Sequence, residues 1–401
     1  MTPSTVISVV KPLIHLHQEG RVKARILLED FVKPSDIGWA DVGVFCRNQE
    51  PRYAWIREAL IEHSKPYIYD LDDNFYEIPL DTQAGKYYRE PSRINELNRY
   101  LECASVVRVY SDSLLVRVLS YNKCVEKVAP SLDWSLIPAV PPVRDSKHSK
   151  RIQIVYVTSR LQDTLAKIFI DDIERILKHF GTRVKIIFWG PTNRYQSIDG
   201  IRYLSPILNY DRFLSKLARS GFDIGLAPLL DDSFHRSKTN NKYREYGACR
   251  IAGIYSDVSV YSSCVEHKET GLLVPAHPGA WFDALATFIE DRLLREKIQD
   301  QAQKDVRSRY SQEQSENTWM EQFERIILLR KTTPHIKYTW DKQAIIAKNK
   351  ARNRSIILKI ILKIPHLFRH IRNYGLRNTV QVIKWRIHSR LEIWKIQRKL
   401  L

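Results

Sequence analysis

Two short apolar runs on either side of a polar, cation-rich loop constrain this chain more than any other feature. Residues 223–229 (DIGLAPL) and 251–255 (IAGIY) have strand length and are bounded by turn residues, which is typical of buried parallel strands. The polar loop 231–239 lies between them and leads into 240–249, a segment compatible with a short helix. The order of strand, loop, helix and strand predicts a parallel sheet with helical crossovers.

The loop and the helix after it carry charges that suit a nucleotide. Arg236, Lys238 and Lys242 supply cations, and Glu245 lies about one helical turn beyond Lys242 on the same face. In an open parallel sheet, ligands bind outside the carboxyl ends of the strands, where helix N-termini favour anions. Cations there suit a pyrophosphate, and a carboxylate one turn further suits a ribose diol. The alternatives are solvated loop cations and, for Glu245, a carboxylate that complements the helix dipole.

The same residues carry a resemblance to a known family. FDIGLAPL, a lysine-containing loop, a Lys-x-x-Glu-Tyr helix start and a Ser-Asp turn follow one another over residues 222–257, and Gly-Leu-Leu-Val follows at 271–274. This order resembles the donor-nucleotide segment of GT-B glycosyltransferases of the retaining group 1 type, over residues 150–325. The resemblance implies an α/β fold of two Rossmann-like domains that face a cleft. It also implies a nucleotide-sugar donor, no metal and no cofactor.

Several positions of the chain can be compared one by one with the motifs of that family. Many of its members carry two glutamates eight positions apart; Glu245 matches the second, but Ser237 stands where the first would contact the donor sugar. The lysine at position 238 resembles the pattern of a subgroup of the family that uses lysine in this loop. Family members often place an arginine after the first strand of the domain to reach the donor phosphates, and Arg160 is the candidate here. The alternative for Arg160 is a surface or salt-bridged structural arginine.

Alternating strands and helices before this region predict a first parallel sheet. The expected strands are 24–28, 42–46, 66–70, 105–111 and 125–130, and the expected helices are 1–19, 53–63, 92–101 and 112–119. The strand and glycine-rich turn that open the family's first domain are missing. Residues 138–150 contain three prolines and are the natural linker. We therefore expect an acceptor-side domain (1–140), a nucleotide-sugar-binding domain (151–330) and an extension (331–401).

An acidic cluster follows the expected strand 66–70. Asp70, Asp72 and Asp73 are costly to crowd at a strand end unless water or a ligand uses them. One interpretation is the acceptor side of the cleft, with Asp72 and Asp73 as candidate catalytic residues. A second is an Asx turn with helix capping. A third, an Asp-x-Asp metal site of the other glycosyltransferase fold, disagrees with the surrounding pattern.

The extension 331–401 differs from the rest of the chain in charge. It holds 18 Lys or Arg and two acids, so it carries +16 of the net +19. Apolar residues recur at spacings of three and four among these cations, which predicts basic amphipathic helices. Such helices lie on anionic membranes. A partner-protein helix and a nucleic-acid contact are the alternatives, and no RNA-binding motif supports the last.

The cysteines and the apolar runs limit the cellular location. The five cysteines form no Cys-x-x-Cys pair, so neither a disulfide framework nor a zinc site is suggested. No run reaches the ~18 apolar residues that span a bilayer. We expect a cytoplasmic protein associated with the inner face of the membrane.

These observations favour a glycosyltransferase that moves a sugar from a nucleotide-sugar donor to a glycan or lipid-linked acceptor. Assembly of surface polysaccharide or lipopolysaccharide is the expected role, with no nucleic-acid partner. The alternative from another class is a non-catalytic GT-B-like protein that binds glycan or acts as a scaffold at the membrane surface. The missing first strand and Ser237 favour that alternative, whereas Lys238, Lys242 and Glu245 argue against it.

Overall fold

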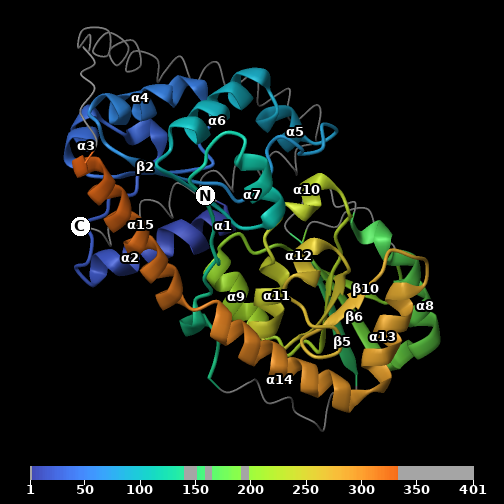
Figure 1. Ribbon diagram of the computed structural model, residues 1–401. Helices are drawn as coiled ribbons and strands as arrows, with labels where there is room; N and C mark the ends of the chain where they lie inside the picture. The colour runs from blue at the N-terminus through green and yellow to red at the C-terminus, as the bar shows by residue number, and fades with distance from the viewer. Residues whose placement is uncertain (1, 140–150, 159–164, 191–197, 333–401) are drawn as a thin grey trace.

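The computed structural model describes residues 2–139, 151–158, 165–190 and 198–332, which form two parallel sheets surrounded by helices (Figure 1). The expected linker falls outside these residues from 140 on, and the basic extension falls outside them from 333 on. Among the described helices, none is both long enough and apolar enough to cross a membrane.

The first sheet contains four parallel strands among the described residues, in the order β1-β2-β3-β4. They are β1 Gly43–Cys46, β2 Tyr67–Asp70, β3 Val106–Val109 and β4 Val125–Lys127. The helices of this part are α3 Pro34–Trp39, α4 Ala54–Glu62, α5 Gln83–Tyr88, α6 Pro91–Cys103 and α7 Asp112–Val118. Every residue of β2 and β3 is buried, so both faces of the sheet centre are covered, as is usual for parallel sheets.

The predicted strand 24–28 is wrong. These residues have irregular backbone and belong to neither sheet. Their apolar side chains are only half-buried, so they have no core face against which a strand would pack. The pattern ARILL has strand-like composition, but composition without a hydrogen-bonded neighbour and a buried face does not fix a strand.

The second sheet has six parallel strands in the described part of the chain, in the order β10-β9-β8-β5-β6-β7. They are β5 Ile152–Val157, β6 Val184–Trp189, β7 Ile201–Leu204, β8 Ile224–Ala227, β9 Ala252–Ser256 and β10 Leu272–Val274. The helices are α8 Ile170–Phe180, α9 Tyr210–Ala218, α10 Ser233–Arg236, α11 Asn241–Ala248, α12 Ser259–Ser262, α13 Ala280–Glu290 and α14 Arg292–Arg309. This order is that of a dinucleotide-binding Rossmann sheet.

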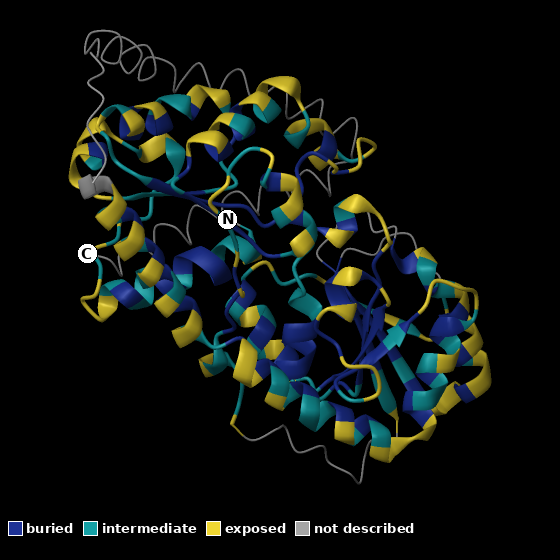
Figure 2. Cartoon of the chain, viewed as in Figure 1, coloured by how far each residue is buried: buried dark blue, intermediate teal, exposed yellow. Residues whose placement is uncertain are grey.

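Helices cover both faces of the second sheet, and the alternation of side chains along β5 shows how. Ile154 and Tyr156 pack with α8 and α13 in one core, whereas Val155 and Val157 pack with α9 and α11 in the other. Five of the six strands are mostly buried, and β7, at the edge of the sheet, is partly exposed (Figure 2). Because successive side chains of a strand point to opposite faces, a nearly continuous apolar run serves both cores.

The two ends of the described chain meet on the first sheet. The first helix is continuous through α1 Pro3–Thr5, a π-helical turn Val6–Val10 and α2 Lys11–Gln18. The last, α15 Gln312–Thr332, runs from the second domain back to the first (Figure 1). They share one cluster of buried residues, Val9, Leu13, Leu16, Ile68, Val106, Trp319 and Ile326. A segment that the sequence places in the second domain therefore packs on the first.

Polar contacts fix α15 in this position. The guanidinium of Arg108, on β3, lies 3.7 Å from the ring centroid of Trp319 and donates to Gln322. The indole Nε1 of Trp319 donates to the carbonyl of Ser8 at 3.1 Å. Ser8 lies in the π-helical turn, so the interrupted part of the first helix supplies an acceptor that helps to hold α15 in place.

Candidate functional site

The candidate donor site lies where the strand order of the second sheet reverses. β5 and β8 are neighbours, although two strands separate them in the chain. Ligands of open α/β sheets bind at the carboxyl ends of such a pair. The loop after β8 leads through α10 to the N-terminus of α11 at this edge. Arg160, expected after β5, lies outside the described residues.

Glu245 and Lys242 form an ion pair on α11. Lys242 Nζ lies 2.5 Å from Glu245 Oε2. Glu245 is 4 % exposed, and the side chain of Lys242 is 24 % exposed. The expected placement on one helix face is confirmed. The pairing offsets part of the cost of burying the two groups, and the remaining lone pairs of the Glu245 carboxylate can accept hydrogen bonds from hydroxyl groups.

Lys238 joins the two domains. Its Nζ lies 2.5 Å from Asp73 Oδ1, a residue of the turn after β2 in the first domain. The ammonium also lies 3.8 Å from the ring centroid of Phe234. Two candidate residues that the sequence assigned to opposite sides of a cleft, one to the donor and one to the acceptor, are therefore in direct contact.

Each of the three carboxylates after β2 contacts a cation, and Asp72 and Asp73 share Arg47. Asp70 is buried and accepts from Arg108 Nε at 3.2 Å and from the hydroxyl of Tyr110. Asp72 pairs with Arg47 at 2.9 Å, and Asp73 pairs with Lys238. Burial raises the pKa of Asp70 to about 6, against the opposing effect of Arg108. The crowding predicted from sequence is thus relieved by three cations, Arg108, Arg47 and Lys238.

Arg47 is a site residue that the sequence analysis missed. It follows β1 with a positive φ of 61°, and its guanidinium lies 2.9 Å from Asp72 and 3.6 Å from Asp73. Phe75 and Tyr88 flank it, with ring centroids 4.8 Å and 5.6 Å away. Burial opposes its charge, but Asp72 and Asp73 outweigh burial and raise its pKa. The sequence could have indicated this contact, because Arg47 and Asp72 follow neighbouring parallel strands, whose carboxyl ends lie at one edge of the sheet.

Asp72 keeps one oxygen without a partner. The residue is 4 % exposed, and its Oδ1 has no hydrogen bond within the described parts of the chain. Its other oxygen accepts from Arg47. A buried acceptor atom of this kind is a place where a substrate hydroxyl can donate.

Ser237, which stands in place of a glutamate, is a structural residue. It is fully buried, and its hydroxyl donates to the carbonyl of Ser233 at 2.8 Å. The same hydroxyl lies 3.3 Å from the amide of Asn74 and 3.3 Å from the hydroxyl of Ser113, both in the first domain. Ser237 therefore contributes to the contact between the domains.

Two further loop residues are held away from the Lys242–Glu245 pair. Arg236 makes a two-pronged, exposed ion pair with Asp231 at 2.6 and 2.9 Å. His235 is 6 % exposed, and its Nδ1 lies 2.8 Å from Asp232, which also caps α10. The Asp231 carboxylate holds Arg236 by hydrogen bonds and raises its pKa. Arg236 thus has a nearby carboxylate with which a phosphate would compete.

The tyrosines of α11 pack as expected. Tyr243 and Tyr246 are fully buried, and the hydroxyl of Tyr246 donates to the carbonyl of Leu226 at 2.9 Å. A Cβ added to Gly225, on β8, would come within 2.6 Å of the Tyr246 ring. The close approach of α11 to β8 therefore requires glycine at this position, and it sets the place of Glu245.

Arg244 ties α11 to the end of the first domain. It is 2 % exposed and donates to the carbonyl of Ser131 at 2.7 Å and to the Asn240 side chain at 3.2 Å. Burial lowers its pKa. The guanidinium is satisfied by neutral acceptors, so it fixes the helix geometrically.

Solved structures share the fold of this chain. HepE of Anabaena, in complex with UDP and glucose, aligns at 16% identity with a TM-score of 0.54 over 73% of this chain and 79% of that chain. Sucrose-phosphate synthase from Thermosynechococcus elongatus aligns at 13% identity and 0.55 over 82% and 81%. A glycosyltransferase from Rickettsia africae aligns at 15% identity and 0.55 over 79% and 87%. No protein-family model and no curated protein sequence matches the chain.

The chain has the GT-B fold. The α/β architecture of two Rossmann-like domains expected from the sequence is therefore confirmed. In this GT-B fold the Lys242–Glu245 pair and Lys238 belong to the second domain, and Arg47, Asp72 and Asp73 belong to the first. Identity below 25% carries the fold alone, so the reaction rests on the site residues.

Proposed function

We propose that this protein is a nucleotide-sugar glycosyltransferase, with the donor on the second domain and the acceptor on the first. The observation that carries the proposal is the meeting of Lys238 with Asp73 at 2.5 Å. It brings the loop after β8 to the acidic turn after β2. UDP, bound in the HepE complex, is the nucleotide that we expect first.

Each candidate residue has a task in this proposal. Lys238, Lys242 and Arg160 neutralise the pyrophosphate, and Arg236 is available at the edge of the loop. Glu245 accepts hydrogen bonds from the ribose diol, since a carboxylate binds a diol with both oxygens. Cations and a helix N-terminus then stabilise the departing nucleoside diphosphate without a metal or other cofactor.

The transfer itself exchanges one bond for another. The bond from the anomeric carbon to the phosphate oxygen breaks, a bond to the acceptor hydroxyl oxygen forms, and the hydroxyl proton passes to a base. Asp72 and Asp73 are the candidate bases of the first domain, and the unpartnered Oδ1 of Asp72 favours Asp72. The group 1 resemblance favours retention of anomeric configuration.

Donor binding has to break the contact between the domains at Lys238. In this structure Asp73 forms an ion pair with Lys238, the residue that we assign to the pyrophosphate of the donor. A donor therefore competes with Asp73 for Lys238, and release of Asp73 leaves that carboxylate at the reacting centre. This exchange would couple donor binding to the position of the acidic turn.

A thermal-stability panel of nucleotides tests the proposal. We expect UDP, GDP, CMP or dTDP-type ligands of one class to raise the unfolding temperature of the full-length chain. A ligand at ~100 times its dissociation constant adds about 2.7 kcal/mol. Lys238→Met should weaken the response, whereas Lys216→Met, on α9 away from this loop, should not. No response to any nucleotide, from a protein that unfolds cooperatively, would reject the proposed activity.

The basic extension 331–401 suggests where the acceptor is. We propose that it binds the inner, anionic membrane face and that the acceptor is a lipid-linked glycan of surface polysaccharide or lipopolysaccharide assembly. The support is its charge of +16 with amphipathic spacing.

Vesicle flotation tests the membrane proposal. The protein should float with vesicles that contain anionic lipid, remain behind with neutral vesicles, and lose binding in high salt because exposed charges are screened. Equal binding to both vesicle types, or none, would contradict it. Tight, salt-sensitive binding to nucleic acid instead would favour a nucleic-acid partner.

A second candidate function rests on Ser237. Ser237 stands at the position of the family's first glutamate, so the loop supplies no glutamate to hold a donor sugar. Ser237 itself is buried and bonded to the first domain. A non-catalytic glycan-binding or scaffold protein with this fold would retain the domain contact and need no nucleotide. The nucleotide panel separates the two candidates.

A further inference from the structure

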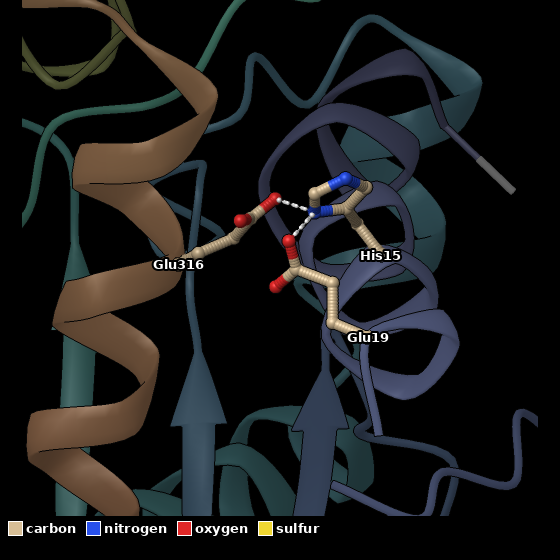
Figure 3. A group of neighbouring side chains, drawn as sticks. All are labelled: His15, Glu19 and Glu316. Atoms are coloured by element: carbon tan, nitrogen blue, oxygen red, sulfur yellow. Dashed lines mark ion pairs between the residues drawn. The ribbon is translucent and has the colours of Figure 1, made fainter. Parts of the chain in front are cut away.

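A second cluster of polar side chains lies away from the donor loop, where the first and last described helices meet. His15 of α2 and Glu19, the C-cap residue of that helix, face Glu316 of α15 (Figure 3). The atoms that could bind a metal all lie within 4.8 Å of one another. His15 and Glu19 are four positions apart, so they share one face of α2.

The geometry around His15 is that of ligands around a common point. Its Nδ1 lies 2.9 Å from Glu316 Oε1 and 3.7 Å from Glu19 Oε1. Nδ1 is buried and has no hydrogen-bond partner in the described part of the chain: the contact with Glu19 is too long for a hydrogen bond, and the contact with Glu316 does not have the geometry of one. Two atoms that are close but not aimed at each other can both be aimed at an ion between them. Ligand bonds of 2.0–2.2 Å are typical of zinc with imidazole and carboxylate.

The two carboxylates of this cluster also favour the binding of a cation. Glu316 is 3 % exposed and accepts from the neutral amide of Gln312 at 2.7 Å. Arg21 pairs with the other oxygen of Glu19 at 3.7 Å. The described ion pairs give Glu316 no lysine or arginine partner, so a divalent cation would supply positive charge to the two carboxylates and the imidazole.

We propose that His15, Glu19 and Glu316 bind a divalent transition-metal ion, with zinc as the best fit. One imidazole and two carboxylates match the borderline character of zinc better than that of magnesium or calcium, which prefer oxygen ligands alone. His15 and Glu19 are 44 % and 42 % exposed in their side chains, which leaves an entry path and room for water as a fourth ligand.

The site holds α15 against α2. α15 connects the second domain to the first and precedes the basic extension. A metal at this place would tie the returning helix to the first helix and so limit the relative motion of the two domains. It lies apart from the donor loop, so the transfer reaction itself remains independent of the metal.

Metal titration of the full-length protein tests the site. After treatment with a chelator, we expect zinc chloride to bind with one equivalent by calorimetry and to raise the unfolding temperature, whereas magnesium chloride does neither. Cobalt(II) should give the visible absorption of a low-coordinate site with nitrogen and oxygen ligands. Glu316→Gln and His15→Asn should each weaken zinc binding at least 10-fold, and Glu313→Gln, an exposed neighbour on α15, should not.

Other results would overturn the inference. Zinc binding of equal strength in the variants would place the ion elsewhere. No zinc binding by folded wild-type protein would show that His15, Glu19 and Glu316 contact one another without a metal. Circular dichroism of each variant before titration separates lost binding from lost fold, and Glu19→Gln, which alters an exposed residue, gives a third variant with little risk to folding. Nucleotide binding is measured in parallel, so failure here stays distinct from failure of the proposed function.

Discussion

Glu245→Gln is expected to lower the affinity for the donor nucleotide about 10- to 100-fold. A hydrogen bond to a charged group contributes about 1.5–3 kcal/mol, and glutamine keeps the shape of Glu245 while it removes the charge. Lys242 keeps a polar neighbour in this variant, because the amide oxygen can still accept its hydrogen bond. The fold should therefore survive the change.

Calorimetry with the nucleotide found in the panel gives the measurement. The matched control is Glu269→Gln, since Glu269 also pairs with a lysine, Lys297 at 2.6 Å, but lies on the surface. The control should bind as wild type does. If Glu245→Gln also binds with unchanged affinity, Glu245 is a structural partner of Lys242, and the ribose contact lies elsewhere.

Arg108→Met is expected to destabilise the protein by about 3–5 kcal/mol, because it leaves the buried carboxylate of Asp70 without its cation. Asp70 and Arg108 are each 1 % exposed. The same change removes the contacts of Arg108 with Trp319 and Gln322 of α15. We expect the unfolding temperature to fall by about 10 °C.

The deficit should depend on pH. Burial raises the pKa of Asp70 to about 6, above its unfolded value near 4. The folded state therefore holds this proton more tightly, and stability from this group is lost as pH rises from ~4 through ~6. Without Arg108 the pKa rises further, so the variant should be closer to wild type at pH 5 than at pH 8.

Thermal unfolding at the two pH values provides the readout. The control is Arg325→Met, which removes an exposed cation of α15 from its pair with Glu126; exposed pairs contribute about 0–1 kcal/mol. Adding Asp70→Asn to Arg108→Met should recover part of the loss. A deficit that is equal at both pH values would show that packing against Trp319, rather than the charge of Asp70, is what Arg108 supplies.

Local patterns were enough to predict most strands of both sheets. The runs at 42–46, 66–70, 223–229 and 251–255 became β1, β2, β8 and β9 because each is apolar, short and bounded by turn residues. The run at 24–28 has the same composition and failed, since a strand also needs a partner and a core. Helix boundaries shifted by one or two residues, since the helix expected at 92–101 is α6, Pro91–Cys103.

The candidate site was partly readable for the same reason. Lys242 and Glu245 share a helix face by spacing alone, and their ion pair is local. Lys238 and Asp73 are 165 positions apart. The residues next to each of them in the sequence do not indicate that the two side chains meet. Arg47 and Arg108 escaped notice because an isolated arginine after or within a strand has no local signature of its carboxylate partner.

The sequence by itself determined the order of strands and helices, the parallel second sheet, the shared face of Lys242 and Glu245, and the separation of a basic extension. These follow from spacing of a few residues, over which backbone geometry is nearly fixed. Only the tertiary structure decided which cation meets each of Asp70, Asp72 and Asp73, and that α15 returns to the first sheet. Those outcomes depend on long-range packing. A buried charge without a partner is costly, and the partner comes from whichever distant segment the fold places beside it.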